Sequence, residues 1–562
     1  METQITVIVL VLAGFLAFAG VCMYHNIRQK NIRRARIKAS YGKRPDREYE
    51  YAEFEAISHY FKLRKKDGFQ VDDTTWNDLD MDTIFMLLNH TWSCIGESYL
   101  YAMLRTPSNS KKELEERNLL VEYFRTHPLQ RERMEFFFAG IGKTGGHSIF
   151  DSIYNLADYQ RESSLIHYFS IAVVLGAAVG IVIAPQYGIL ALIAALFFSW
   201  GTYLSRKKKI EPYVISCTCL LEMLKAADSL KKMAEPETEG YIQKIAAARK
   251  CFNRFKRNSF FVIHGGSLKT GGSIEQSLLT YVNLTFHFDL IQFSTMVGEL
   301  NKNMEAFEAL TENIGMLESA LAVASFRTMI KAYCIPKLQK TEAVFVKAKD
   351  IYHPMIEEAV KNSIEVERGV LLTGSNASGK STFLKTMAVN AILAQTIYTC
   401  MAEQYEGNFC KIYSSMSLKD DLTSQESYYI VEIKSLKRIL DHVGEDIPLF
   451  CFVDEVLRGT NTIERIAASS QILKSMARSN VMCFAATHDI ELTYILEQLY
   501  ENYHFQEEVY ENDILFNYQL YKGRATSRNA IKLLRIIGYE DDIIQKAELL
   551  AQQFAETGEW SL

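Results

Sequence analysis

The sequence predicts an α/β domain of the P-loop type, a mainly α-helical core and three transmembrane helices in one chain of 562 residues. Three observations predict this combination. A glycine-rich loop with a lysine stands between an apolar strand pattern and a helical pattern near residue 374. Long stretches before this loop repeat apolar residues at helical spacing. Two apolar blocks, at residues 5–24 and 166–204, are long enough to cross a bilayer.

The first apolar block runs from Ile5 to Tyr24, about twenty residues, which is enough for one bilayer crossing. Only one charged residue, Glu2, precedes it, whereas many basic residues follow it at once: Arg28, Lys30, Arg33, Arg34, Arg36, Lys38, Lys43 and Arg44. The positive-inside rule therefore places the N-terminus outside and the rest of the chain in the cytoplasm. A cleaved signal peptide is the alternative, but it carries its basic residues before the apolar run. We expect an uncleaved anchor over 1–26 and a basic juxtamembrane and linker segment over 27–78.

The next segment, residues 79–160, is predicted to form the first part of the helical core. Leu87, Ile95, Leu100 and Leu104 recur at helical spacing within it. Its residues 140–144, G-I-G-K-T, are similar to the end of a phosphate-binding loop, but a phenylalanine stands where the earlier glycine is required. We therefore interpret 140–144 as a linker.

The second apolar block runs from Ile166 to Leu204 and is interrupted by Pro185–Gly188. Each half has about eighteen residues, just long enough to cross a bilayer, and the basic run Arg206–Lys209 follows. Two crossings return the chain to the side it left, so we expect a transmembrane hairpin over 161–209 with both flanks in the cytoplasm. A buried hairpin of a soluble protein is the alternative; the absence of charge from His167 to Ser205 favours the membrane. A helical pattern then continues, and 210–345 is expected to complete the helical core.

The loop Gly374–Ser381 reads G-S-N-A-S-G-K-S and fits the P-loop pattern G-x-x-x-x-G-K-[ST]. The apolar run Val370–Thr373 precedes it and a helical pattern follows, which is the context that the motif needs. Backbone N–H groups of such a loop can surround phosphate oxygens. Lys380 is expected at the β- and γ-phosphates, and the Ser381 hydroxyl at Mg²⁺.

Two further apolar runs end in polar side chains that suit phosphate chemistry. Pro448–Val453 closes on Asp454 and Glu455, as a buried parallel strand presents them at its C-terminal end. Asp454 is expected to bind Mg²⁺, and Glu455 to orient or deprotonate the attacking water. His488 follows the run Val481–Phe484. A lone histidine would be interpreted as a surface residue, but its position after a third strand favours a catalytic role.

Composition adds two restrictions. The ten cysteines are scattered without a C-x-x-C pair, which indicates reduced thiols rather than disulfides or a zinc site. The net charge of −5 gives no global basic excess of the kind that DNA-binding proteins often show.

One basic and aromatic stretch, Arg249–Arg257, leaves three interpretations open. It can bind nucleic acid through phosphates and stacked bases, lie on anionic lipid headgroups, or form a solvated helix face.

Four segments, in this order, resemble the ATPase domain of the MutS DNA mismatch-repair family, which is related to ABC-type ATPases. T-G-S-N-A-S-G-K-S-T at Thr373–Thr382 is close to the family's T-G-P-N-M-G-G-K-S-T. D-D-L-T-S-Q-E-S-Y-Y-I-V-E-I at Asp420–Ile433 is close to D-D-L-x-x-G-x-S-T-F-x-x-E-M. D-E-V-L-R-G-T-N-T at Asp454–Thr462 is close to D-E-x-G-R-G-T-S-T, although Leu457 replaces a glycine. A-T-H-D at Ala486–Asp489 is close to A-T-H-Y.

The resemblance implies an ABC-like ATPase domain over 346–520, a helical tail over 521–562, and lever helices within 210–345. It implies ATP and Mg²⁺ as ligands, with the metal held by Ser381 and Asp454 and catalysis by Glu455, His488 and Lys380. The nucleotide-binding residues that it implies are Gly374, Asn376, Gly379, Lys380, Ser381, Thr382 and Ser427. In the family the serine that Ser427 matches approaches the γ-phosphate bound by the opposite subunit. The resemblance therefore implies a homodimer formed through the ATPase domains.

The family's mismatch-reading device, an F-x-E motif near the N-terminus, is missing there. F-x-E occurs only at Phe505–Glu507 and Phe554–Glu556, beyond the ATPase motifs. We therefore expect a membrane-anchored MutS-like ATPase without the mismatch-reading domain, multi-pass in the cell membrane with its ATPase domain in the cytoplasm. As a dimeric switch it would bind DNA, or mismatched or structured DNA, as the family does. The alternative is a membrane ATPase whose dimer closure acts on a membrane protein partner without DNA.

Overall fold

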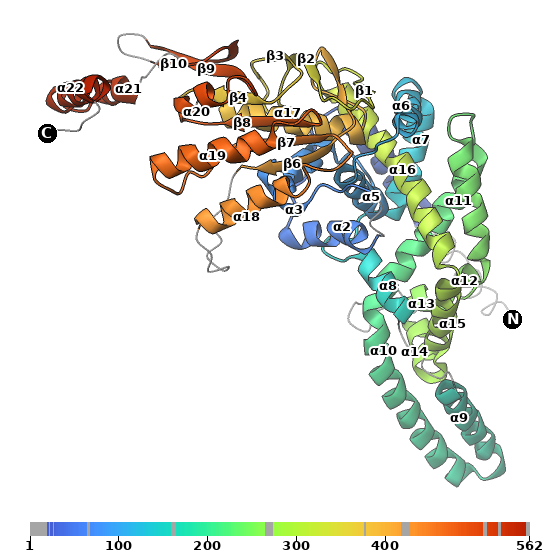
Figure 1. The fold of residues 1–562 in the computed structure, drawn as a ribbon. Helices are drawn as coiled ribbons and strands as arrows, with labels where there is room; N and C mark the ends of the chain where they lie inside the picture. The colour runs from blue at the N-terminus through green and yellow to red at the C-terminus, as the bar shows by residue number, and fades with distance from the viewer. Residues whose placement is uncertain are drawn as a thin grey trace. The chain divides into compact units, whose positions relative to one another are not determined.

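The computed structural model describes residues 20–21, 23–25, 27–64, 68–158, 165–264, 274–375, 378–416, 428–509, 514–525 and 530–557. Most of the predicted anchor over 1–26 lies outside these residues. The chain divides into two compact units, coloured along the chain in Figure 1. The helical unit contains residues 1–65, 88–102 and 119–329, and the sheet unit contains residues 66–87, 103–118 and 330–562.

The regular elements among the described residues of the helical unit are all helices, joined by turns and loops. A helix covers residues 27–40, and the longer helices that follow pack around α16 and α10. The elements are α2 (Tyr51–Leu63), α5 (Cys94–Arg105), α6 (Lys111–Thr126), α7 (Pro128–Ile141), α8 (Ile149–Asp158), α9 (Leu165–Ile183), α10 (Pro185–Leu230), the 3₁₀ turn η1 (Lys231–Met233), α11 (Glu239–Cys251), α12 (Asn253–Arg257), α13 (Phe260–His264), α14 (Ile274–Phe286), α15 (Phe288–Lys302) and α16 (Met304–Met329). The chain of α5 and of α6 contributes to both units.

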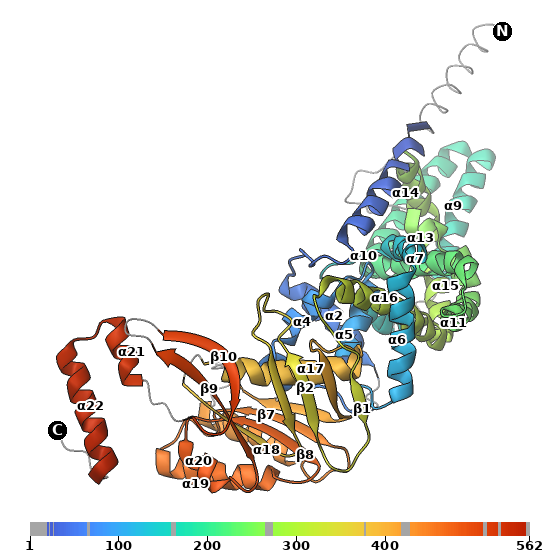
Figure 2. The ribbon, with the colours of Figure 1, turned by 90° about the horizontal axis from the view of Figure 1, so that it is seen from above.

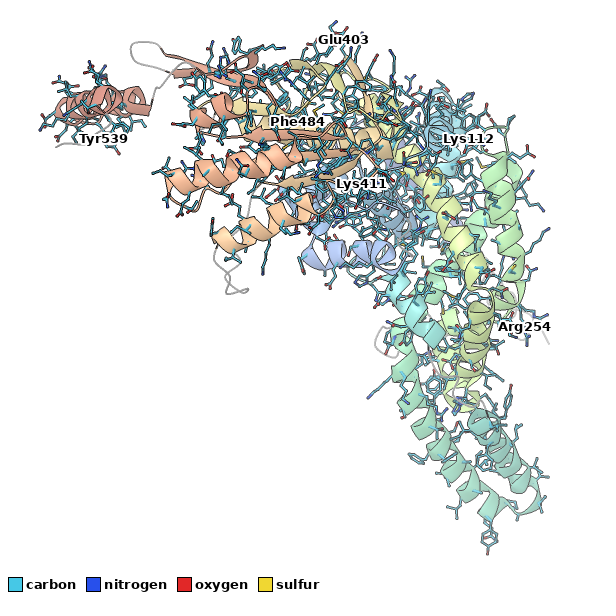
Figure 3. The ribbon with its side chains drawn as sticks, viewed as in Figure 1. Lys112, Arg254, Glu403, Lys411, Phe484 and Tyr539 are labelled. Atoms are coloured by element: carbon cyan, nitrogen blue, oxygen red, sulfur yellow. The ribbon has the colours of Figure 1, made fainter. Side chains whose placement is uncertain are left out.

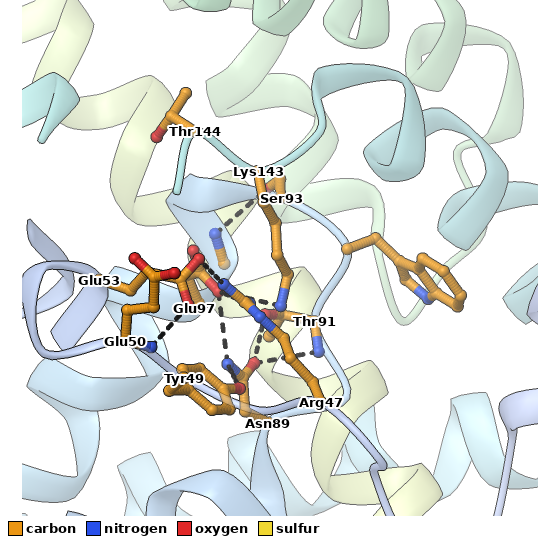
Figure 4. Close-up of polar contacts among 12 residues, drawn as sticks. Arg47, Tyr49, Glu50, Glu53, Asn89, Thr91, Ser93, Glu97, Lys143 and Thr144 are labelled. Atoms are coloured by element: carbon orange, nitrogen blue, oxygen red, sulfur yellow. Dashed lines mark hydrogen bonds and ion pairs between the residues drawn. The ribbon is translucent and has the colours of Figure 1, made fainter. Parts of the chain in front are cut away.

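A buried polar cluster holds the N-terminal part of this unit to the core (Figure 4). The Glu97 carboxylate accepts one hydrogen bond from Arg47, at 2.8 Å, and pairs with Lys143 at 2.9 Å. Burial lowers the pKa of Lys143, and Glu97 opposes that change. Lys143 belongs to the segment interpreted as a linker. It lies in the loop after α7, where Gly142 has a φ of +76°. Its ammonium group pairs with Glu97 inside the helical unit.

The predicted break at Pro185–Gly188 is confirmed by the turn between α9 and α10. α9 ends at Ile183, and Pro185 stands at the first position of α10, where a missing N–H costs nothing. A Cβ on Gly188 would lie 2.4 Å from the Ile181 nitrogen, so the two helices require glycine there. Both helices are long and apolar enough to cross a membrane by length and composition. α10 continues through Lys209, the predicted end of the hairpin, to Leu230.

The sheet unit contains two sheets. The larger has the strand order β10-β9-β4-β8-β7-β6, and the smaller has the order β1-β5-β2-β3. The strands are β1 (Lys337–Gln339), β2 (Val346–Ile351), β3 (Asn362–Val366), β4 (Val370–Thr373), β5 (Gln404–Asn408), β6 (Lys411–Ser415), β7 (Leu449–Asp454), β8 (Val481–Ala486), β9 (Glu501–Val509) and β10 (Ile514–Lys522). From β9 through β4, β8 and β7 to β6 the pairs are parallel, and β10 is antiparallel to β9.

Helices cover both faces of the larger sheet (Figures 1 and 2). α17 (Lys380–Thr396) lies on one face, and α18 (Tyr428–Leu440), α19 (Thr462–Met476) and α20 (Ile490–Ile495) lie on the other. β7 and β8 are buried except at the Asp454 end, as strands covered on both faces must be. Phe484 of β8 is fully buried, whereas Arg254 lies at the surface of the helical unit (Figure 3). The C-terminal helices are α21 (Ala530–Ile537) and α22 (Asp541–Thr557).

Residues 66–87, which were assigned by sequence to a linker and the start of the helical core, belong to the sheet unit. They include α3 (Asp73–Asp78) and α4 (Met81–Leu88). Asp78 is 3% exposed, and its carboxylate accepts hydrogen bonds from the Ser414 hydroxyl at 2.7 Å and from the Met416 N–H at 3.0 Å. The Asp78 carboxylate therefore provides the hydrogen-bond acceptor for the backbone N–H that follows the last residue of β6.

Candidate functional site

Three neighbouring parallel strands bring the predicted residues to one edge of the larger sheet. Leu372 of β4 pairs with Ala486 of β8, and Ala486 pairs with Asp454 of β7. The P-loop, Asp454 and the segment of His488 therefore leave the sheet at the same level. Ligands of open α/β sheets bind beyond the carboxyl ends of the strands, where this edge lies.

The P-loop backbone needs glycine at both ends. Gly374 has a φ of +143° and Gly379 a φ of +106°, and a Cβ on Gly374 would lie 2.6 Å from the Phe505 carbonyl oxygen. Lys380 is the first residue of α17, and its Nζ donates to the carbonyls of Gly374 and Ser375 at 2.9 Å and 2.8 Å. The ammonium group thus points into the loop, where phosphate oxygens would also bind. Burial lowers its pKa, which Asp454, Glu455 and Glu507 oppose.

Asp454 and Ser381 fit a divalent cation. Burial raises the pKa of Asp454, and the neighbouring Ser381 hydroxyl opposes that change. Among the described residues, the carboxylate oxygen Oδ1 of Asp454 is buried without a hydrogen-bond partner. A buried carboxylate oxygen without a partner is costly, and a hard cation both satisfies it and favours its ionised form. The donor set of one carboxylate and one hydroxyl is also the oxygen set that Mg²⁺ prefers.

Glu455 is held by two cationic or polarisable groups. His488 Nε2 lies 2.8 Å from Oε1, and Arg458 lies 2.8 Å from Oε2. The hydrogen bond with His488 lowers the pKa of Glu455, burial opposes it, and Arg458 and Lys380 lower it further. Both oxygens are therefore engaged, which makes Glu455 a weak base in this arrangement. It gains basicity only when one of these contacts opens.

A cavity of about 530 Å³ adjoins the P-loop. Gly379, Lys380, Ser381, Thr382 and Glu455 line one part of it, as the sequence predicted for a phosphate site. The rest of its wall includes Ile351, Tyr352, His353, Ile356, Asn362, Phe505 and Tyr518. Asn376 and Ser427 lie outside the described residues, so their predicted roles stay predictions.

Tyr518 is the aromatic residue that sequence reasoning missed. The segment between His353 and the P-loop offers no aromatic ring to stack on a base, but β10 brings Tyr518 against the P-loop. A Cβ on Gly379 would lie 3.2 Å from its Cδ1. The strand is irregular there, between Phe516 and Leu520, and Tyr518 has a φ of +52°. No local signal predicts this, because the contact depends on the register of a hairpin far along the chain.

The F-x-E motif at Phe505–Glu507 also belongs to this site. The Phe505 ring packs against Phe383 of α17 with ring centroids 5.8 Å apart. The Glu507 carboxylate accepts a hydrogen bond of 2.8 Å from the Ser375 hydroxyl of the P-loop. Both side chains are buried, with exposures of 2% and 7%, and they support the P-loop and α17.

The basic and aromatic stretch Arg249–Arg257 forms α12 and the end of α11 in the helical unit. Phe252 and Phe255 are buried, with exposures of 0% and 1%, so neither ring is free to stack on a base. Arg249 and Lys256 both pair with Asp228, at 2.6 Å and 2.8 Å. This pattern favours the solvated helix face among the three interpretations.

Comparison with known proteins agrees with these motifs. Residues 370–555 match the family model of MutS domain V. The chain is 27% identical over 316 residues to MutS protein homolog 4 from Homo sapiens, covering 53% of this chain and 32% of the relative. It is 29% identical over 215 residues to DNA mismatch repair protein MutS from Thermus thermophilus, covering 37% and 26%. It is 29% identical over 294 residues to DNA mismatch repair protein MutS from Leptospira interrogans, covering 49% and 34%. The chain thus spans about a third of the length of these relatives.

Proposed function

Because the chain belongs to the MutS family through its domain V, we propose that it is a membrane-anchored ATPase that acts as an ATP-dependent dimeric switch. One observation carries the proposal. Lys380, Ser381 and Glu455 line one cavity at the carboxyl edge of a parallel sheet, and Asp454 adjoins Ser381. Hydrolysis of ATP is the reaction that this set of groups supports best.

Each residue has a definite part in this reaction. Lys380 exchanges the carbonyls of Gly374 and Ser375 for oxygens of the β- and γ-phosphates. Ser381 and Asp454 would hold Mg²⁺, which when bound would neutralise charge on the transferring phosphoryl group. Glu455 leaves one of its partners and accepts the proton of the attacking water on that oxygen. His488, freed from Glu455, can donate to an oxygen of the γ-phosphate.

Variants of the detergent-solubilised full chain test hydrolysis. Glu455→Gln is expected to retain ATP binding and to lower kcat by about 10²- to 10⁴-fold, since only proton transfer is lost. Lys380→Ala should instead weaken nucleotide binding. Lys474→Ala, at an exposed position of α19, serves as the control and should match the wild type. Wild-type turnover by Glu455→Gln, with contaminating ATPases excluded, would refute the base assignment.

Membrane attachment is the second part of the proposal. The apolar helices α9 and α10 support it, with Val182, Ile183 and Tyr187 exposed by 84%, 80% and 73% near their turn. A cysteine placed at Gln186 should react with an impermeant maleimide from outside the cell. A reporter fused after Leu562 should give the cytoplasmic signal. Recovery of the chain in the soluble fraction without detergent would overturn this part.

DNA binding and action on a membrane protein partner are the two forms that the switch can take. The relatives are named for DNA mismatch repair, which favours DNA. The burial of Phe252 and Phe255 removes one candidate DNA contact and leaves the partner form as the alternative. Titration of a labelled duplex at several salt concentrations separates them. A steep fall of affinity with salt supports DNA binding, and no binding at low salt supports the alternative.

A further inference from the structure

A recess of about 520 Å³ lies in the helical unit, between the helix over residues 27–40 and α7. The two helices run antiparallel. A Cβ on Gly140 would lie 3.6 Å from a guanidinium nitrogen of Arg33, and Lys38 pairs with Glu132 at 3.5 Å. The nucleotide cavity is lined by residues of the sheet unit, so this recess is a separate feature of the molecule.

The wall of the recess is mainly apolar. Leu129, Phe136 and Phe137 of α7 line it, together with Ala35 of the facing helix. The Leu129 side chain is 66% exposed, so water reaches this apolar surface. Covering such a surface with an apolar group is favourable, whereas a small inorganic ion would leave it wet.

The rim of the recess is positively charged. Arg34, Lys38 and Arg133 line it with one carboxylate, Glu132. Because Glu132 pairs with Lys38, the two arginines leave an excess of positive charge beside the apolar wall. A ligand that suits both parts carries an anionic group next to an apolar one.

Phe136 orients two of the cations at this rim. The guanidinium carbons of Arg33 and Arg34 lie 5.7 Å and 5.1 Å from the centroid of its ring, within the range of cation–π contacts. Among the described residues, neither arginine pairs with a carboxylate. A guanidinium has five N–H donors that suit phosphate oxygens. Because the Phe136 ring already packs against two guanidinium groups, the recess is poorly suited to a stacked nucleobase.

The rim lies near an apolar stretch of the chain. The exposed side chains of Met23, Tyr24 and Ile27 precede a basic run that begins at Arg28. Arg34 follows Ile27 by about two helical turns, roughly 10 Å along the axis. Helix side chains tilt toward the N-terminus, which here is the apolar end. The headgroup layer on each side of a bilayer is roughly 5–8 Å thick, so a long arginine side chain spans most of the remaining distance.

We propose that the recess binds one anionic phospholipid of the cytoplasmic leaflet, with its phosphate at Arg34 and Arg133 and the start of an acyl chain against Leu129 and Phe137. The inference goes beyond ATP hydrolysis and rests on the membrane attachment in the proposed function. α7 also packs against α10, whose apolar part is a candidate membrane span. Basic segments beside a span attract anionic lipids, and the apolar wall selects a molecule with both chemical parts.

The test measures binding of short-chain lipids to the full chain in a neutral detergent, by native mass spectrometry. Dioctanoyl phosphatidylglycerol is expected to bind at least about tenfold more tightly than dioctanoyl phosphatidylcholine, because only the first has a net negative charge. Glycerol 3-phosphate offers the phosphate without acyl chains. It should bind at least about tenfold more weakly than phosphatidylglycerol, since the burial of two CH₂ groups already contributes this factor.

Three variants locate the site, and their side chains are exposed, so folding is preserved. Arg34→Gln and Arg133→Gln should each weaken phosphatidylglycerol binding about fivefold, the contribution of one basic residue near an anionic lipid surface, and leave phosphatidylcholine binding unchanged. Leu129→Ser should weaken the binding of both lipids and leave that of glycerol 3-phosphate unchanged. Lys112→Gln removes one exposed positive charge from α6 and is the control, which should match the wild type.

Equal affinity for the two lipids, or unchanged phosphatidylglycerol binding in both arginine variants, would overturn the inference. Equally tight binding of glycerol 3-phosphate would assign the recess to a free phosphate compound, and full displacement of the lipid by a short DNA duplex would assign it to nucleic acid; either result rejects a lipid site. Recovery of the chain without detergent would instead refute membrane attachment. Fractionation and lipid titration are separate measurements, so the two failures are distinguishable.

Discussion

Leu457 shows how one residue can be held in a conformation that its own side chain disfavours. Its φ is +57° and its side chain is 3% exposed, packed in the core beneath α18 and α19. The left-handed conformation costs roughly 1–2 kcal/mol for a residue with a Cβ, whereas burying a leucine stabilises the fold by about 1.5–3 kcal/mol. Burial therefore outweighs the backbone strain, and the hydrogen bond that the Leu457 N–H donates to the Glu432 carboxylate adds to it.

Two truncations at Leu457 measure the energetic cost of its left-handed backbone conformation separately from the loss of packing. Leu457→Ala and Leu457→Gly both remove the packing, but only alanine retains the strain. We expect the glycine variant to be more stable than the alanine variant by about 1 kcal/mol, measured from their thermal unfolding midpoints. The same pair at Leu473, a buried residue inside α19, should show the opposite order by about 1 kcal/mol. The same order at both positions would contradict the strained conformation.

The raised pKa of Glu135, on α7, predicts that the stability of the helical unit depends on pH. Burial raises its pKa to about 8, and Arg131 only partly opposes this. Because the folded pKa lies above the unfolded value, the stabilising contribution is complete below about pH 4.5 and is lost as the pH rises through about 8. Glu135→Gln imitates the protonated form and should keep its midpoint between pH 5 and pH 9, whereas the wild-type midpoint falls. Glu132→Gln, at a half-buried carboxylate of the same helix that pairs with Lys38, should behave as the wild type does.

At the scale of elements, the base of the α9–α10 hairpin is fastened by buried polar groups. Asp289, the second residue of α15, accepts hydrogen bonds from Lys207 at 2.6 Å and Tyr203 at 2.9 Å, both on α10. His287, between α14 and α15, lies 2.9 Å from His167 of α9 and contacts Ser199 of α10. Three segments distant in the sequence thus share one polar core, which ties the hairpin to the helices that lead to α16.

Removal of one member of this core should be costly. Asp289→Ala leaves the Lys207 ammonium buried without its partner, and we expect a loss of about 3–5 kcal/mol in stability. The double variant Asp289→Leu with Lys207→Met replaces both charges by apolar groups and should recover most of that loss. Thermal unfolding in detergent measures both. A loss below about 1 kcal/mol in Asp289→Ala, the range of exposed ion pairs, would show that the pair is not sequestered.

The strands around the site could be predicted from sequence, and the long-range contacts could not. Lys380, Asp454 and Glu455 follow short apolar runs whose local pattern indicates a strand end, and parallel pairing then brings them to one edge. Tyr518 and Glu507 reach the same site only through the register of β9 with β10 and β4. Asp78 reaches β6 from more than three hundred positions away. The contact between Glu432 and the Leu457 N–H could not be predicted either, because it depends on the backbone conformation of Leu457.

At the scale of the whole molecule, the chain combines two helices that are long and apolar enough to cross a membrane with a segment, residues 370–555, that matches the family model of MutS domain V. The central proposal is that ATP joins two copies of the chain, because Ser427 of one copy completes the P-loop site of the other. An isologous dimer of this kind contains two composite sites. Nucleotide binding and hydrolysis would then shift the chain between associated and separate states.

Mixing two inactive variants tests this proposal most directly. Lys380→Ala damages the P-loop side of a site, and Ser427→Ala damages the side supplied by the other subunit. A mixed dimer then has one site with both lesions and one with neither, so Mg²⁺-dependent ATP hydrolysis should partly return when the two proteins are combined. Differently tagged chains would be purified together to prove that mixed dimers form. Partial recovery is the result that the account predicts, and no recovery in proven mixed dimers would contradict independent composite sites shared between two chains.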